Sequence, residues 1–379
     1  MCIRDREYRS ADGLGNREAV QSLQVRIDTV PPVTTEDLTG TPGLNGWYRS
    51  AVQVDLAAGD ATSGVAVTRY RIDGGAWQAY SGPFTISSDG NHTVEYYSED
   101  VAGNREAVQS VQVPVDTTPP ATTATPAGTA GNAGWWRSDV QVSLAASDAA
   151  SGVAFTRYRV DGAAAWIDYA HPFVVSGDGA HTVEYRSWDR AGNTEAVQTL
   201  DLRIDTASPT STITTLSDGD WISGTVGVAG TAADATSGVA SVAWSSDGGS
   251  TWQGASGTTS WSASWDTTAG PDGDYLVCSR AEDVAGNREA ETCITVHVDN
   301  TPPSTTTSPS GTMGNNGWWQ SDVQVSLSAS DGSGIGVAST EYRVDGGPWQ
   351  TYTGPFTVSG DGTHTVEYRS TDGLSLIHI

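Results

Sequence analysis

The stretch D-V-A-G-N-R-E-A-V-Q-S-V-Q-V-P-V-D-T-T-P-P, residues 100–120, recurs along the chain and decides how it is organised. Its Gly-Asn pair ends at residues 16, 104, 193 and 287, so that successive copies are 88, 89 and 94 residues apart. A period of this length is typical of one small domain per repeat and exceeds that of most solenoid units. The sequence therefore predicts an array of independent domains.

The second full repeat, residues 118–206, shows the pattern most clearly. Val140–Ala145 and Phe155–Val160 alternate apolar and polar residues, as half-buried strands do, and Asp161-Gly162 is a hairpin signal. The expected strands are Ala121–Thr125, Val140–Ala145, Phe155–Val160, Trp166–Tyr169, Pro172–Val175, His181–Ser187 and Ala196–Ile204. Helical periodicity is missing, and turns recur every 8–12 residues. This pattern predicts an all-β fold made of immunoglobulin-like β-sandwiches.

The D-T-x-P-P junctions set the predicted domain boundaries. We expect a C-terminal hairpin of a truncated domain at residues 1–29, full domains at 30–117, 118–206 and 207–300, and a domain lacking its last strand at 301–379. Paired prolines favour an extended polyproline conformation and remove backbone donors. Because the junctions are short and proline-rich, they predict stiff links and an elongated rod.

The two ends depart from the repeat. Residues 1–6 and 374–379 resemble read-through sequence at the ends of translated short-read assemblies, so we leave them out of the fold prediction. The chain is accordingly expected to be a fragment.

The composition is strongly acidic. The 45 Asp and Glu residues against 19 Lys and Arg leave a net charge of −26. Such a chain repels phosphate backbones and anionic lipid head groups, which argues against nucleic-acid and membrane-surface partners. No apolar run approaches the ~18 residues of a membrane-spanning helix. The acids indicate either a solvated surface or a surface that binds cations.

The combined motifs resemble a known family. D-x-x-S-G-V, Y-R-[IV]-D-G-G-x-W, H-T-V-E-Y, D-x-A-G-N and V-D-T-x-P-P follow one another in the order seen in bacterial Ig-like repeats. The pattern is closest to repeats labelled after a leptospiral outer-membrane protein and is similar to the C-terminal Ig-like domain of chitobiase-type enzymes. The third domain, 207–300, resembles a related bacterial Ig subtype. The resemblance implies a non-catalytic spacer or stalk of a secreted or cell-surface protein, or else an adhesive or carbohydrate-binding accessory module.

Catalytic motifs are missing from the sequence. His92, His181 and His364 fill one position of the repeat, and repetition at equivalent positions indicates folding or surface design. A catalytic group, in contrast, usually occurs once. We therefore predict that the segment is not an enzyme.

Calcium binding is the alternative interpretation of the repeated aspartates, because carboxylate oxygens are the ligands that this ion prefers. Loop aspartates and domain-exit aspartates would converge between consecutive domains if the two classes meet at one pole of a sandwich. The candidates are Asp60, Asp116, Asp148, Asp205, Asp234 and Asp299. Ordinary turn chemistry, in which Asp caps its own turn, explains the same residues without an ion.

Tryptophans and cysteines supply the remaining candidates. Trp77, Trp166 and Trp349 follow a hairpin in each repeat and indicate either sugar-binding platforms or core packing. Cys278 and Cys293 flank the third domain's Gly-Asn turn almost symmetrically. This placement predicts a cross-strand disulfide and therefore an oxidising compartment, and the alternative is a pair of reduced, buried thiols.

Overall fold

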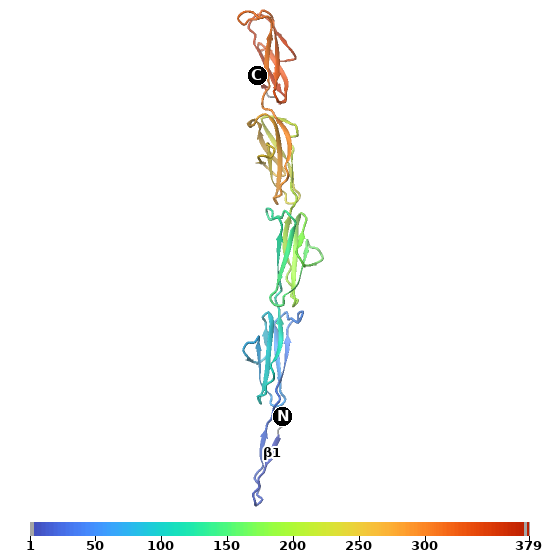
Figure 1. The fold of residues 1–379 in the computed structure, drawn as a ribbon, viewed down its shortest axis with the longest axis vertical. Coiled ribbons are helices and arrows are strands. Elements are labelled where there is room, and N and C mark those ends of the chain that lie inside the picture. Colours follow the sequence, from blue (N-terminus) through green and yellow to red (C-terminus); the bar gives the residue numbers. More distant parts are fainter. Residues whose placement is uncertain (1–3, 375–376, 379) are drawn as a thin grey trace. The chain divides into compact units, whose positions relative to one another are not determined.

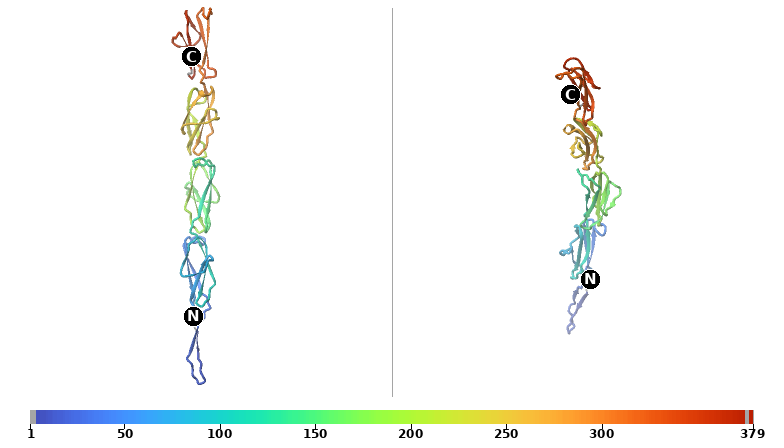
Figure 2. Two further views of the ribbon diagram at one scale, coloured as in Figure 1. Left: turned by 90° about the vertical axis from the view of Figure 1, so that its left-hand side faces the viewer. Right: turned by 45° about the horizontal axis from the view of Figure 1, so that its top comes forward.

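The computed structural model describes residues 4–374 and 377–378 of the chain, and Cys2 lies outside them. Within this range every regular element is a β-strand except the single 3-10 turn Thr267–Ala269 (η1). The predicted all-β fold is confirmed. Four sandwiches, each of two sheets, and an N-terminal hairpin can be followed by colour in Figure 1, and Figure 2 gives two further views of their layers.

The first full sandwich has a three-stranded and a four-stranded sheet, in the orders β3-β4-β7 and β6-β5-β8-β9. Its strands are β3 (Val33–Thr39), β4 (Val52–Gly59), β5 (Val65–Ile72), β6 (Gln78–Ala79), β7 (Phe84–Ile86), β8 (Gly90–Asp100) and β9 (Gln109–Val115).

The second sandwich repeats this topology, with sheets β10-β11-β14 and β13-β12-β15-β16. Its strands are β10 (Ala121–Ala127), β11 (Val140–Ser147), β12 (Val153–Val160), β13 (Ile167–Asp168), β14 (Phe173–Val175), β15 (Gly179–Asp189) and β16 (Gln198–Ile204). All seven strands predicted from the sequence are present, with ends that shift by two residues at most. The Asp161-Gly162 pair has positive φ angles of 52° and 66°, as a type I′ hairpin turn requires.

The third sandwich is the variant. Its sheets are β17-β19-β22 and β18-β24-β23-β20-β21, and β18 pairs with β24 in parallel. Its strands are β17 (Thr210–Ile213), β18 (Trp221–Ile222), β19 (Thr225–Ala233), β20 (Val239–Ser245), β21 (Gln253–Gly254), β22 (Ser260–Asp266), β23 (Gly273–Asp283) and β24 (Thr292–Val298).

The fourth sandwich has sheets β25-β26-β29 and β28-β27-β30-β31. Its strands are β25 (Ser304–Ser310), β26 (Val323–Ser330), β27 (Val337–Val344), β28 (Gln350–Thr351), β29 (Phe356–Val358), β30 (Val366–Asp372) and β31 (Ile377–His378). The sequence predicts no last strand here, whereas the structure has the two-residue β31 beside β30. The N-terminal hairpin consists of β1 (Arg4–Tyr8) and β2 (Gln21–Val25).

Alternation along the strands builds each core. In β4 the residues Val52, Val54 and Leu56 are buried, while the intervening Gln53 and Asp55 are exposed. Successive side chains of a strand point to opposite faces, so one face enters the core and the other meets water. These residues pack with Ile86, Val94, Tyr96, Val113 and Val115 into one cluster.

The third sandwich fills its core with tryptophans. Trp244, Trp261 and Trp265 are at most 9% exposed and belong to one buried cluster. Gly230 makes room for Trp261, because a Cβ at this position would lie 1.8 Å from the carbonyl oxygen of Thr212 and 2.7 Å from the indole ring. Trp244, Trp261 and Trp265 of this domain are therefore core residues.

Candidate functional site

Each sandwich brings three aspartates together where the preceding linker enters. In the second sandwich they are Asp116 of the linker, Asp148 of the turn after β11 and Asp189 at the end of β15, and one carboxylate oxygen of each lies within 4.8 Å of the others. We call such groups acidic triads. The described residues form four of them: Asp28–Asp60–Asp100, Asp116–Asp148–Asp189, Asp205–Asp234–Asp283 and Asp299–Asp331–Asp372.

Two members of each triad shape their own turns. Asp148 Oδ1 accepts the backbone N–H of Gly152 at 2.6 Å, and Asp189 Oδ1 accepts those of Gly192 (2.7 Å) and Asn193 (2.8 Å). Gly152 and Gly192 have φ angles of 80° and 96°, in the region that favours glycine. These hydrogen bonds are the turn-capping interactions that the sequence analysis gives as the alternative to calcium binding.

The linker aspartate is held from both sides. The N–H of Asp116 donates to Tyr48 O (2.8 Å) in the preceding sandwich. Its carbonyl oxygen accepts from Asn193 Nδ2 (2.9 Å), and its Oδ2 accepts from the N–H of Ser151 (3.1 Å), both in the following sandwich. This explains why the repeated turn ends in asparagine: the amide reaches back to the linker.

The same arrangement recurs at the next junction. The N–H of Asp205 donates to Trp136 O (2.8 Å), while its carbonyl oxygen accepts from Asn287 Nδ2 (2.9 Å) and its Oδ2 from the N–H of Ser237 (3.0 Å). Two junctions thus share one set of bonds, because the residues that make them belong to the repeat.

Burial and repulsion act on the carboxylates. Burial raises the pKa of Asp116, the bonds from Ser151 lower it, and Asp148 raises it further. The pKa of Asp331 is also raised, mainly by burial and in part by Asp299 and other nearby acids. At Asp28 hydrogen bonds prevail and the pKa is lowered. The triads of Asp116 and Asp331 are therefore places where negative charge is costly.

The six aspartates proposed from the sequence all lie in triads. Asp116 meets Asp148 and Asp205 meets Asp234, while Asp60 and Asp299 belong to the first and last groups. Sequence reasoning missed the third member. It opens the D-x-A-G-N turn as Asp100, Asp189 and Asp283, and Asp372 takes its place in the fourth sandwich. The recurrence of this Asp in every repeat was the available signal.

The hairpin tryptophans pack against arginines. The Arg71 guanidinium lies 4.7 Å from the ring centroid of Trp77, and those of Arg159 and Arg186 lie 4.9 and 4.7 Å from that of Trp166. Trp349 has the same relation to Arg343 and Arg369. These cation–π contacts favour the packing interpretation over open sugar platforms.

A buried glutamate ties the first strand of a sandwich to its centre. Glu195 is 7% exposed and accepts from the N–H (2.8 Å) and Oγ1 (2.6 Å) of Thr122 and from the N–H of Ser187 (3.0 Å). Glu106 and Glu289 make equivalent bonds in the first and third sandwiches. Sequence reasoning missed this role, although the Glu stands two residues after Gly-Asn in each complete copy.

The repeated histidines are structural. In His92 the Nδ1 atom lies 2.8 Å from Asp73 Oδ2, and Nε2 lies 2.9 Å from Ser88 O. Nε2 also lies 3.1 Å from Ser88 Oγ, and the pKa of His92 is raised, chiefly by its hydrogen bond with Asp73. His364 is held in the same way by Asp345 and Gly360 O.

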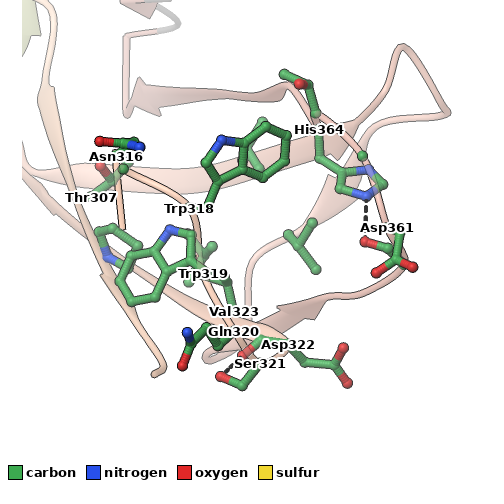
Figure 3. A pocket seen from close by; sticks show the side chains of 18 of the residues that line it. Thr307, Asn316, Trp318, Trp319, Gln320, Ser321, Asp322, Val323, Asp361 and His364 are labelled. Carbon is green, nitrogen blue, oxygen red and sulfur yellow. Dashed lines mark hydrogen bonds between the residues drawn. The ribbon is translucent and has the colours of Figure 1, made fainter. Parts of the chain in front are cut away.

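An open cavity of about 990 Å³ lies in the fourth sandwich (Figure 3). Trp318, Trp319 and His364 line it, and the Trp318 side chain is among the exposed large apolar groups, at 59%. In the first sandwich the edge strand of the four-stranded sheet is β9, and its valines Val113 and Val115 are fully buried. The strand at the same place in the fourth sandwich is the two-residue β31.

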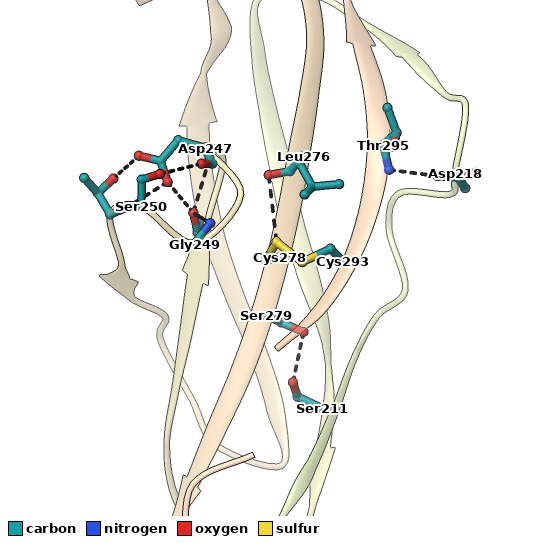
Figure 4. Close-up of a disulfide and its surroundings, with 12 residues drawn as sticks. Ser211, Asp218, Asp247, Gly249, Ser250, Leu276, Cys278, Ser279, Cys293 and Thr295 are labelled. Carbon is teal, nitrogen blue, oxygen red and sulfur yellow. Dashed lines mark hydrogen bonds between the residues drawn. A yellow bond between two sulfur atoms is a disulfide. The ribbon is translucent and has the colours of Figure 1, made fainter. Parts of the chain in front are cut away.

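The structure joins Cys278 of β23 to Cys293 of β24 by a disulfide (Figure 4). The two residues are direct cross-strand partners in the antiparallel register, as their placement around the turn predicts. One residue further along β23, Ser279 Oγ is hydrogen-bonded to Ser211 Oγ at 2.9 Å.

Two family models match the chain. Residues 209–277 match the model described as bacterial Ig domain, and residues 259–348 match bacterial Ig-like domain (group 3). The chain carries bacterial Ig-like repeat domains. The first match lies within the variant third sandwich, and the second runs across the junction into the fourth. The resemblance stated from the sequence motifs is confirmed at this level.

Two of the solved structures that match the chain are distant in sequence. Clostridium thermocellum CbhA fibronectin(III)-like modules are 14% identical, with 47% of this chain and 95% of that chain covered and a TM-score of 0.26. Sidekick-1 immunoglobulin domains 1–5 are 10% identical, with coverages of 96% and 81% and a TM-score of 0.31. No curated protein matches the sequence.

The matched families support a structural or modular role for the chain. In the part that the structure describes, none of the helices has the length and apolar character needed to cross a membrane.

Proposed function

We propose that the chain is a non-catalytic spacer or stalk of a secreted or cell-surface bacterial protein, whose sandwiches hold another domain at a distance. The observation that carries this proposal is the linker aspartate bonded on both sides. A spacer works by resisting bending, and a junction whose backbone is bonded to both neighbours has little freedom to bend.

The chemistry of each junction supports the same role. In the first junction Asp116 is followed by Thr117-Thr118-Pro119-Pro120, and Thr117 and Thr118 donate to the Asp89 carboxylate at 2.6–2.9 Å. Proline fixes φ, and the aspartates remove further backbone freedom. A Gly/Ser linker would instead behave as a random coil.

Small-angle X-ray scattering of the 379-residue chain tests the proposal. A compact globule of this length has a radius of gyration of about 21 Å. The longest strands have 11 residues, or about 36 Å. Four such sandwiches end to end predict a radius of gyration of roughly 40 Å or more. A value near that of the globule would overturn the spacer.

An adhesive or carbohydrate-binding module is the second candidate, and the exposed Trp318 indole at the cavity of Figure 3 is the observation that favours it. A glycan array decides between the two. The spacer predicts no specific binding, whereas binding that Trp318→Ala abolishes would establish the adhesive role.

A further inference from the structure

The triad of the second sandwich contains a buried oxygen without a donor. Asp189 is 1% exposed, and its Oδ2 atom has no hydrogen-bond partner. At the equivalent Asp100 and Asp283 this oxygen accepts from the side-chain amide of Asn104 or Asn287, at 2.8 Å in both cases. The second triad therefore differs from the first and third in one unsatisfied carboxylate oxygen.

No ion pair compensates this triad. Among the described residues of the second sandwich, the ion pairs are Arg157–Asp168, Arg159–Glu184 and His181–Asp161, and none includes a triad member. Asp116 is fully buried, and one oxygen atom of each of the three carboxylates lies within 4.8 Å of the other two. A buried negative charge without a positive charge beside it is energetically unfavourable, so a bound cation would stabilise this group of carboxylates.

The chemistry of the ligands indicates which cation. The triad offers carboxylate oxygens that lie within 4.8 Å of one another, and carboxylates are hard ligands that suit calcium and magnesium. Calcium accepts irregular oxygen shells completed by water, while magnesium demands near-ideal octahedral geometry. Three carboxylates fixed by turn and linker hydrogen bonds favour the less demanding ion, calcium.

We propose that Asp116, Asp148 and Asp189 bind a calcium ion where the linker enters the second sandwich. The ion joins a linker carboxylate to two carboxylates of the following sandwich and neutralises their mutual repulsion. This site goes beyond the spacer role, because a spacer can be stiffened by hydrogen bonds alone.

Calorimetric titration of the chelator-treated full chain with CaCl₂ tests the site, with MgCl₂ titrated in parallel. We expect calcium to bind with a Kd in the range of about 0.1–1 mM that is usual for extracellular modules, and magnesium to bind more weakly. Asp148→Asn keeps an oxygen for Gly152 but removes a charge, so one calcium should be lost from the stoichiometry or bound at least ~10-fold more weakly. Asp168→Asn, outside the triad in the same sandwich, should bind as the parent does.

Asp189→Asn separates a metal site from a purely structural turn. Its Oδ1 can still accept from Gly192 and Asn193, and its new amide can donate to the neighbouring carboxylates. We expect this variant to melt no lower than the parent in chelator and to lose the rise in melting temperature that calcium gives the parent. A parent that binds no calcium at 10 mM, or an Asp148→Asn variant that binds it unchanged, would overturn the proposal and leave the spacer untouched.

Discussion

The side-chain amide of Asn193 donates to the backbone carbonyl oxygen of Asp116 at 2.9 Å, and so fastens a linker to the sandwich that follows it. The N–H of the same aspartate is bonded to Tyr48 O in the sandwich before it. The turn that ends in Asn193 thus holds the linker against the sandwich that follows it.

Asn193→Ala should loosen this junction. Loss of one partly buried hydrogen bond costs about 1 kcal/mol and leaves the Asp116 carbonyl oxygen unsatisfied. Hydrogen–deuterium exchange should become faster at Thr118, whose N–H donates to Asp116 Oδ1. Gln198→Ala, at an exposed position of β16, serves as the control. Equal exchange at Thr118 in both variants would show that the amide does not hold the linker.

Glu195→Gln should destabilise the second sandwich. A glutamine amide cannot replace the carboxylate oxygen that accepts from Thr122 or Ser187, so one buried donor loses its partner at a cost of about 1–3 kcal/mol. Glu184→Gln removes the same charge at a more exposed ion pair with Arg159 and should have a small effect. Chemical denaturation of the two variants compares them directly. If both unfold alike, the buried network is not important for stability.

The His92–Asp73 pair predicts a pH dependence. The pKa of His92 is raised in the folded state, so its contribution to stability is present below the unfolded value of about 6.5 and is lost as the pH rises through the folded value. The ring resonances of His92 should therefore titrate at higher pH in the parent than in Asp73→Asn. The stability difference between the two chains should also shrink from pH 6 to pH 9. A titration midpoint that Asp73→Asn leaves unchanged would contradict the pairing.

Gly230→Ala should destabilise the third sandwich by about 1–3 kcal/mol or more, because the new methyl group meets Thr212 O and the buried Trp261 ring. Gly227→Ala on the same strand β19 is the matched control, since a Cβ there has no atom within 4 Å. Thermal unfolding followed by tryptophan fluorescence reads out both. Equal melting temperatures would show that the core tolerates the overlap.

The Cys278–Cys293 bridge closes a loop with a sequence separation of 15 residues and should contribute about 3 kcal/mol. Alkylation of the denatured chain without reductant should leave the peptides that contain these cysteines unmodified, and reduction should expose both. Alkylation of either cysteine before reduction would show free thiols.

The sequence predicted the strands well because alternation and turn residues act locally. Val140–Ala145 and the Asp161-Gly162 turn need no knowledge of the rest of the chain. The acidic triads are only partly visible in the sequence: the repeat suggests that linker and loop aspartates such as Asp116 and Asp148 can meet, whereas Asp189 stands in a turn motif that explains it without a partner. Its second role depends on a contact with Asp116, 73 residues earlier in the chain.

Glu195 shows the same limit. A glutamate after a Gly-Asn turn is ordinarily a surface residue, and its burial follows only from the approach of Thr122 on the first strand of the other sheet. In the sequence, long-range packing of this kind is indicated only by the recurrence of the same residue in each repeat.

Pulsed electron paramagnetic resonance tests the central claim, restrained junctions, most directly. Spin labels at Thr85→Cys and Thr123→Cys, two exposed positions on either side of the first junction, are measured in a Cys2→Ser background. The account predicts a single narrow distance distribution that broadens when Gly-Ser-Gly-Ser is inserted between Thr118 and Pro119. A distribution equally broad with and without the insertion would contradict it.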